Sequence, residues 1–201
     1  MAGDPIRVGV LAIQGAVEEH LAALRRCGVA EPRPVRSTEE IRELDGLIIP
    51  GGESTTVGKL MERWGMDQAI QERAAEGMPV FGTCTGMILM AREIEGSDQQ
   101  RLGLVDMSVR RNAFGRQVDS FESPIEVPEV GEEPVPGVFI RAPFVTHTGA
   151  GVEVLGSYGG HPVLVRQGNR IAGAFHPELT DDTRLHEYFL AVVRAHRRHR
   201  S

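Results

Sequence analysis

The sequence has no hydrophobic run that approaches the roughly 18 residues needed to cross a membrane. Its first residues lack the positively charged segment and apolar stretch of a secretory signal. Its two cysteines, Cys27 and Cys84, are too few for a disulfide framework and are typical of a reducing compartment. These absences predict a cytoplasmic protein that does not associate with a membrane.

Basic residues are also in deficit, with 22 Lys and Arg against 28 Asp and Glu and a net charge of −6. Because proteins that bind nucleic acid usually present a basic surface, we expect no nucleic-acid ligand. The hydrophobic share of 41% and the charged share of 25% are ordinary for a globular protein. A length of 201 residues fits one domain, so residues 1–201 are expected to fold as a single unit.

In the first half, short apolar runs alternate with segments of helical spacing. The predicted strands are residues 7–12, 46–50 and 78–81, and the predicted helices are residues 16–27, 57–76 and 85–93. Ser37 and Glu40 have the spacing of a capping box at the start of a further helix. Alternation of strands and helices predicts a parallel sheet with helices on both faces.

The second half has a different character. Residues 102–175 contain short apolar runs separated by many Gly and Pro residues, and Gly168 with Asn169 predicts a hairpin turn. Residues 126–137 carry three prolines and several acids, which favours a surface loop, and residues 183–199 return to helical spacing. The expected fold is therefore α/β with an additional antiparallel or mixed β region.

The pattern Gly-Thr-Cys-Thr-Gly at residues 82–86 follows an apolar strand and precedes a helix. It matches the nucleophile elbow G-x-S-x-G, with cysteine in place of serine. Glycines on both sides permit a turn that is too tight for larger residues. A helix N-terminus also favours the thiolate form of Cys84. The alternative is a structural cysteine buried at a strand–helix junction.

A thiolate nucleophile needs a base and a group that orients the base. Of the seven histidines, His176 stands out because it follows an apolar strand and begins the sequence His176-Pro177-Glu178. In extended backbone, residues two apart point the same way, so Glu178 is expected to lie beside the imidazole. Five other histidines lie in contexts that suggest no partner. A strand-end histidine with a capping glutamate is the alternative interpretation.

A glycine-rich loop, Pro-Gly-Gly-Glu-Ser-Thr-Thr, occupies residues 50–56 after a buried strand. It is not a phosphate-binding P-loop, because the nearby Gly58-Lys59 is followed by Leu60 and not by Ser or Thr. A loop of this kind can instead direct backbone N–H groups at a developing oxyanion. The predicted donors are the N–H groups of Gly52 and Thr85.

The cysteine elbow, the Pro-Gly-Gly loop and the His-Pro-Glu sequence resemble those of the triad (class I) glutamine amidotransferases. Residues 12–20, 51–56, 111–121 and 175–180 are similar to those of one family, the glutaminase subunits of pyridoxal 5′-phosphate synthase. The Arg-Asn-x-Phe-Gly-Arg-Gln block is the most discriminating. Thr85 is a departure, since the family more often has Ala there; a backbone N–H does not depend on that difference.

The resemblance implies a three-layer, flavodoxin-like fold and a Cys-His-Glu triad. Cys84 would attack the side-chain amide of L-glutamine, His176 would protonate the leaving ammonia, and Glu178 would orient His176. The ammonia would pass to a (β/α)₈-barrel synthase subunit that makes pyridoxal phosphate. No cofactor and no metal ion are expected in this chain.

The resemblance also assigns glutamine contacts by matching position, to Gly52, Glu53, Ser54, Arg111, Ile140 and Arg141. Guanidinium and backbone N–H groups suit an α-carboxylate, and carboxylates suit an α-ammonium group. Gln14, at the carboxyl end of the first predicted strand, is expected to couple the site to the synthase.

Three alternatives remain open at this stage. The first is a stand-alone cysteine hydrolase or peptidase on a related fold. The second is a binding module with a decayed site, against which the intact Cys84, His176 and Glu178 argue. The third is an amidotransferase for another synthase, such as those of histidine or purine synthesis, against which residues 111–121 argue.

Overall fold

A computed structural model describes residues 5–29, 31–114 and 120–200, so residues 115–119 of the discriminating block lie outside the described residues. Within these ranges the central sheet has seven strands in the order β10-β11-β12-β4-β3-β1-β2. Their bounds are β1 Val8–Leu11, β2 Arg33–Val35, β3 Gly46–Ile49, β4 Val80–Thr83, β10 Glu153–Tyr158, β11 His161–Gln167 and β12 Arg170–Gly173.

The topology of this sheet confirms the predicted α/β class. Strands β2, β1, β3, β4 and β12 are parallel, in the order 2-1-3-4-5 of flavodoxin-like sheets. Strands β10 and β11 extend the sheet in antiparallel pairing beyond β12. The strands β1, β3 and β4 are buried along their whole length, as expected for a sheet covered on both faces.

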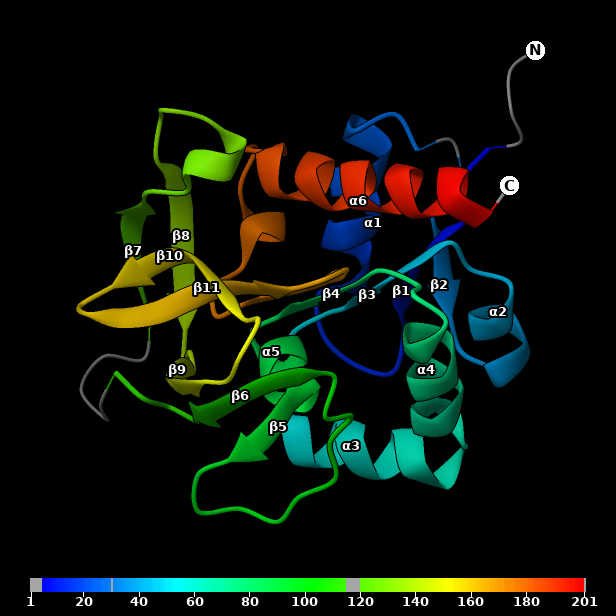
Figure 1. Cartoon of the computed structure of the whole chain (residues 1–201), viewed down its shortest axis with the longest axis horizontal. Coiled ribbons are helices and arrows are strands. Elements are labelled where there is room, and N and C mark those ends of the chain that lie inside the picture. The colour runs from blue at the N-terminus through cyan, green and yellow to red at the C-terminus, as the bar shows by residue number, and fades with distance from the viewer. Residues whose placement is uncertain (1–4, 30, 115–119, 201) are drawn as a thin grey trace.

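Helices form the two outer layers (Figure 1). Helices α1 and α6 lie on one face of the sheet, and α3, α4 and α5 lie on the other. A further helix, α2, packs against α4. The helix bounds are α1 Val17–Arg26, α2 Thr38–Arg42, α3 Ser54–Arg63, α4 Met66–Ala75, α5 Thr85–Met90 and α6 Arg184–Arg200. Two 3₁₀ turns, η1 Pro128–Val130 and η2 Pro177–Leu179, complete the helical elements of the described residues.

Several local predictions are confirmed. Ser37 Oγ accepts a hydrogen bond from Glu40 N at 3.3 Å, and the Glu40 carboxylate accepts one from Ser37 N at 3.0 Å, which completes the capping box. The predicted hairpin joins β11 to β12 through a turn in which Gly168 has φ +60°. The predicted helical segment 57–76 forms two helices, because Gly65 adopts a left-handed conformation with φ +68°.

The additional β region was predicted over residues 102–175, but β10, β11 and β12 join the central sheet, and two further boundaries are corrected. It consists of β5 Ala91–Ile94, β6 Val105–Arg110 and β9 Phe144–Thr148 in one sheet, and β7 Ser120–Ile125 and β8 Val135–Ile140 in another. The helix expected over 85–93 ends at Met90, because residues 91–94 pair with β6. The loop expected over 126–137 ends earlier, since Val135, Gly137 and Phe139 alternate inward along β8.

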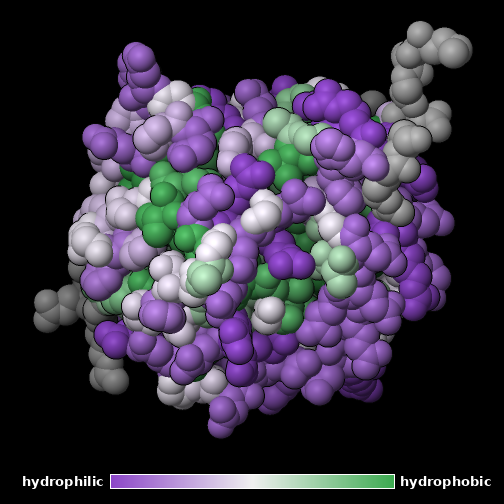
Figure 2. Space-filling model, in the orientation of Figure 1, coloured by the Kyte–Doolittle hydropathy of each residue, from purple (hydrophilic) through white to green (hydrophobic). Residues whose placement is uncertain are grey.

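The surface is largely polar. On the face shown in Figure 2, hydrophilic residues predominate and hydrophobic ones form small, separated patches. Among the helices of the described residues, none combines the length and the apolar character that crossing a membrane requires.

Candidate active site

Four parallel strands bring predicted site residues to one edge of the central sheet, and Arg111, Ile140 and Arg141 join them from the ends of β6 and β8. Gln14 follows β1, Gly52 follows β3, Cys84 directly follows β4 and His176 follows β12. The carboxyl ends of parallel strands share one edge, and in open α/β sheets ligands bind there. The topology therefore brings together residues that are far apart in the sequence.

These residues line a hollow of about 450 Å³. The predicted residues in its wall are Gln14, Gly52, Glu53, Ser54, Cys84, Thr85, Arg111, Ile140, Arg141 and His176. Ile88 and Asn112 also line it and were not predicted. Ile88 carries no distinguishing sequence signal, whereas Asn112 lies within the discriminating block. Glu178 lies behind His176, outside the lining residues.

The turn at Cys84 has the geometry that its sequence pattern predicts. Cys84 has φ +51° and ψ −106°. A Cβ atom added to Gly82 would lie 2.6 Å from the backbone of Gly86, and one added to Gly86 would lie 2.1 Å from the carbonyl oxygen of Ile49. Any larger residue at either position would push the cysteine out of place.

Backbone strain is concentrated around this hollow. Among the described residues, the non-glycine positions with positive φ are Cys84, Asn112 and Arg141, and all three line the hollow. Such conformations cost about 1–3 kcal/mol each and persist where the surrounding structure enforces them, often at functional sites. The strain therefore favours a functional site at this hollow, on grounds that do not depend on any motif.

His176 and Glu178 form the expected pair, although the predicted backbone was wrong. Residues 177–179 form the 3₁₀ turn η2 and not an extended strand, with Pro177 at its first position. This turn brings Glu178 Oε1 to 2.6 Å from His176 Nδ1. Because a carboxylate can only accept, Nδ1 carries the proton and donates it. The other ring nitrogen, Nε2, is thus free to exchange a proton with the nucleophile.

The electrostatics of His176 favour its charged form. Burial of the imidazole opposes protonation, but hydrogen bonds to Cys84 and Glu178 and the negative charges of both groups outweigh it, and they raise the pKa of His176 to about 10. Cys84 Sγ also lies 3.7 Å from the carbonyl oxygen of Ile140. The site can therefore hold a thiolate beside an imidazolium, the reactive pair of cysteine hydrolases.

The glycine loop is held from two sides. Glu53 N donates to Gln14 Oε1 at 2.7 Å, and Thr85 Oγ1 donates to the carbonyl oxygen of Gly52 at 2.5 Å. Both bonds fix the peptide group between Gly52 and Glu53. The backbone N–H of Thr85 does not depend on its side chain, as expected, but the hydroxyl adds a contact that the sequence did not predict, to the loop that supplies the predicted oxyanion donor.

Close packing fixes the preceding peptide group of the loop, between Gly51 and Gly52. A Cβ atom on Gly15 would lie 1.6 Å from the carbonyl oxygen of Gly51, so this carbonyl is directed at Gly15. In a planar trans peptide the N–H points the opposite way, so the N–H of Gly52 faces away from Gly15. A Cβ on Gly51 would lie 2.7 Å from His176 Cε1, which requires glycine there.

The carboxylate of Glu53 caps helix α3. It accepts from Thr55 N at 3.0 Å, Thr56 N at 2.8 Å and Thr56 Oγ1 at 2.7 Å. These hydrogen bonds, led by that of the Thr56 hydroxyl, lower the pKa of Glu53 to about 2. The cap positions the start of α3 at the hollow; the predicted contact of Glu53 with glutamine stays a prediction.

Arg111 is positioned by a residue that sequence reasoning missed. Its guanidinium donates to Gln99 Oε1 at 2.7 Å, and the hydroxyls of Ser54 and Thr55 lie 3.3 Å from the same oxygen. Gln99, which does not line the hollow, thus contacts both Arg111 and Ser54, two of the predicted glutamine-binding residues. No motif marks it, because it lies in an irregular segment between β5 and β6.

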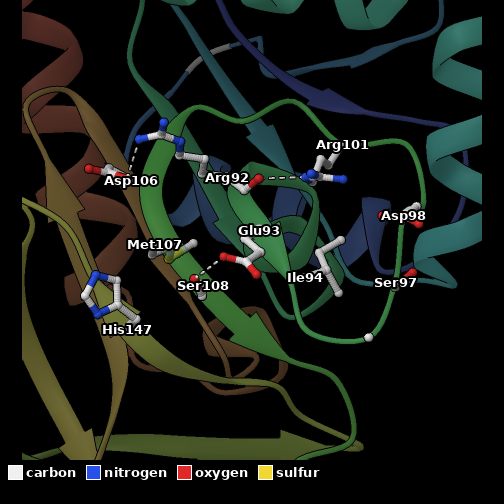
Figure 3. Close-up of a pocket in the computed structure, with 11 residues that line it drawn as sticks. Arg92, Glu93, Ile94, Ser97, Asp98, Arg101, Asp106, Met107, Ser108 and His147 are labelled. Atoms are coloured by element: carbon white, nitrogen blue, oxygen red, sulfur yellow. Dashed lines mark hydrogen bonds and ion pairs between the residues drawn. The ribbon is translucent and has the colours of Figure 1, made fainter.

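A second hollow, of about 690 Å³, is larger but chemically different (Figure 3). It lies along β5, β6 and the segment between them. Four of its polar side chains form two pairs: Arg92 pairs with Asp106 at 3.0 Å, and Ser108 donates to Glu93 at 3.0 Å. It contains no cysteine. We therefore place the chemistry in the smaller hollow.

The fold and the site define a class, the α/β enzymes that hydrolyse amides with a cysteine nucleophile and belong to the glutamine amidotransferases. Comparison with known proteins narrows this class. The chain belongs to the SNO glutamine amidotransferase family, whose model matches residues 10–195.

Individual relatives agree with this assignment. Pyridoxal 5′-phosphate synthase subunit PdxT of Desulforudis audaxviator is 56% identical over 188 residues, which cover 94% of this chain and 99% of the relative. The protein of the same name from Streptomyces avermitilis is 55% identical over 192 residues, covering 94% and 95%.

Solved structures support the fold. A glutamine amidotransferase crystal structure matches with a TM-score of 0.87 and 52% identity, over 92% of this chain and 98% of the other. The structure of PurLQS from Thermotoga maritima matches with a TM-score of 0.65 at 16% identity, over 93% of this chain and 98% of the other. The second likeness concerns the fold alone.

Proposed function

We propose that this chain hydrolyses the side-chain amide of L-glutamine and supplies the ammonia to a (β/α)₈-barrel synthase that makes pyridoxal 5′-phosphate. The observation that carries the proposal is the hydrogen-bonded pair of His176 and Glu178 beside Cys84 in a strained hollow. The names and high identities of the relatives support the particular synthase.

In the first half-reaction, the Cys84 thiolate attacks the amide carbon of glutamine and forms a carbon–sulfur bond. The carbonyl oxygen takes the negative charge, which the N–H groups of Gly52 and Thr85 stabilise. The carbon–nitrogen bond then breaks, and the imidazolium of His176 gives its proton to the departing nitrogen. Ammonia leaves, and a glutamyl thioester remains on Cys84.

In the second half-reaction, water attacks the thioester. Neutral His176 takes a proton from that water as the carbon–oxygen bond forms. The carbon–sulfur bond breaks, glutamate is released, and the thiolate–imidazolium pair is restored. Glu178 keeps the imidazole in the tautomer that presents Nε2 to the reaction throughout.

Glutamine binds, in this proposal, through the hollow's remaining predicted residues. Arg111 and Arg141 face the α-carboxylate, and the backbone of Gly52 and Ile140 with the side chains of Glu53 and Ser54 supplies further contacts. Both arginines line the hollow, and Arg111 is held in place by Gln99. An arginine fork suits a carboxylate.

The setting follows from the same proposal. We place the chain in the cytoplasm, as a single domain over residues 1–201, in a hetero-oligomer with the synthase. Gln14 couples the two proteins, because it already binds the glycine loop through Glu53 N. The net charge of −6 supports a small-molecule substrate over a nucleic acid.

The test is glutamate release from glutamine by the chain mixed with a pyridoxal phosphate synthase barrel. Cys84→Ala should lower kcat by about 10⁶, as loss of a triad nucleophile typically does. Cys27→Ala is the matched control and should retain activity, since Cys27 lies at the end of α1 and not in the hollow. Synthesis of pyridoxal phosphate from ammonium salt should survive in both variants.

Three results would contradict the proposal. Retention of more than a few per cent of activity in Cys84→Ala would exclude this nucleophile. Activation by the barrel of a histidine or purine synthase, and not by that of pyridoxal phosphate synthase, would assign a different partner. Hydrolysis of peptides without any partner would favour the stand-alone hydrolase.

A further inference from the structure

Two buried histidines form a pair that the triad does not use. His20 in α1 and His186 in α6 have no exposed surface. His20 Nδ1 lies 2.9 Å from His186 Nε2, and His20 Nε2 lies 3.0 Å from Thr83 Oγ1. Five of the six other histidines were expected to lack partners, and this is wrong for at least one of these two. These hydrogen bonds join α1, α6 and the end of β4, and burying two polar rings there is costly unless the rings have a structural or functional role.

The pair reaches the triad through Glu178. The Glu178 side chain is fully buried; its Oε2 has no hydrogen-bond partner among the described residues, while its Oε1 accepts a hydrogen bond from His176 Nδ1. His20 Nε2 lies 3.5 Å from this free oxygen. A buried carboxylate oxygen without a donor is costly, so a donor on His20 Nε2 meets a need of the site.

The hydrogen-bond pattern selects one tautomer. If His20 carries its proton on Nε2, that N–H donates to Thr83 Oγ1 and also faces Glu178 Oε2 at 3.5 Å, and Nδ1 accepts from His186 Nε2–H. In the opposite arrangement a lone pair on His20 would face the carboxylate. His186 Nδ1, which has no partner in the described part of the chain, would then be a buried donor left unsatisfied. The tautomer of His20 with its proton on Nε2 is therefore favoured, both by the carboxylate of Glu178 and by His186 Nδ1.

Both rings are neutral near pH 7. Burial, followed by the nearby charges of His186 and His176, lowers the pKa of His20 well below its usual value. Burial, followed by the charge of Arg26, lowers the pKa of His186 to about 4. Glu178 therefore receives a neutral N–H and no second cation, which leaves its charge available to the imidazolium of His176.

We propose that His20 is a positioning residue: its Nε2–H holds the second oxygen of Glu178 so that the first stays directed at His176, and His186 fixes the tautomer of His20. The expected effect of His20 on turnover rests on the proposed function, the hydrolysis of glutamine. His20 extends the triad by hydrogen bonds and one close polar contact that join helices α1 and α6 to His176.

A matched pair of variants tests this role. In His20→Gln, the amide nitrogen occupies the place of Nε2 and can still donate to Glu178. In His20→Asn, the shorter amide reaches only the place of Nδ1, so it can contact His186 but not Glu178. Both variants are polar and close in size, and thermal unfolding checks that both fold.

The first readout is the rate at which iodoacetamide alkylates Cys84 between pH 5 and 9, in a Cys27→Ala background. It reports the thiolate–imidazolium pair without reference to any substrate. A misplaced Glu178 weakens the thiolate–imidazolium pair relative to the neutral thiol and imidazole, so His20→Asn should react more slowly at pH 7, by up to about tenfold, as expected for loss of a polar contact with a charged group. His20→Gln should react within about threefold of the parent, because it keeps a donor facing Glu178 Oε2.

The second readout is glutaminase activity with saturating synthase. His20→Asn should lower kcat by the same factor with the KM for glutamine unchanged, since His20 does not line the hollow. Adding it to Glu178→Gln should cost little more, because the two act through one contact. An absence of glutaminase activity in the parent would refute the proposed function, while the alkylation series would still test the positioning role.

The positioning role is overturned if folded His20→Asn is alkylated as fast as the parent. It is equally overturned if His20→Gln is as slow as His20→Asn, because the donor would then not matter. A drop in thermal stability common to both variants, with unchanged alkylation profiles, would assign the histidine pair to folding alone.

Discussion

Thr85→Val removes one hydroxyl and keeps the shape of a β-branched side chain. That hydroxyl donates to the carbonyl oxygen of Gly52 at 2.5 Å and is one of two side-chain bonds on this peptide group. Without it, the loop that presents the Gly52 N–H is held less firmly. We expect kcat for glutamate release to fall and the melting temperature to stay nearly unchanged.

The magnitude follows from the contact. A neutral hydrogen bond contributes about 0.5–1.5 kcal/mol net, and Gly52 is exposed, so water can satisfy its carbonyl after the substitution. This corresponds to a fall in kcat of about two- to thirteenfold. Complete loss of an oxyanion donor costs about 10²–10³, so the expected effect is a fraction of that limit.

The assay is steady-state glutamate release with and without saturating synthase. Thr85→Ser is the control, because it retains the hydroxyl and should stay close to the parent. Wild-type kcat in Thr85→Val would refute the anchoring role of the hydroxyl. An equal loss in Thr85→Ser and Thr85→Val would show that the methyl group, not the hydrogen bond, is what matters.

Three further predictions concern residues at or behind the same hollow. Glu178→Gln should lower kcat less than His176→Asn, because the carboxylate orients the imidazole and does not take its proton; equal losses would contradict this division. Gln14→Ala should lower synthase-stimulated glutamate release with little effect on the basal rate, and an equal proportional loss in both states would place Gln14 in catalysis. Gln99→Leu should raise the KM for glutamine about tenfold or less with kcat retained, because Arg111 loses its acceptor at 2.7 Å; an unchanged KM would exclude this role.

Features that depend on neighbouring residues could be predicted from the sequence alone. The elbow at Cys84, the capping box at Ser37 and the hairpin turn at Gly168 each arise from steric or hydrogen-bond rules that act within a few positions. The alternation of strands and helices likewise determined the α/β class. The pairing of His176 with Glu178 was also predicted, although by way of an extended backbone that the 3₁₀ turn replaces.

Features that depend on packing between distant segments were decided only by the tertiary structure. The hydroxyl of Thr85 meets a carbonyl 33 positions away, and His20 meets partners 63 and 166 positions away. Residues 91–94 became a strand because β6 offers an open edge, which no local preference reveals. Local sequence patterns therefore reveal the predicted nucleophile and base. The hydrogen bonds that orient these residues form only when folding brings the strand ends and the covering helices together.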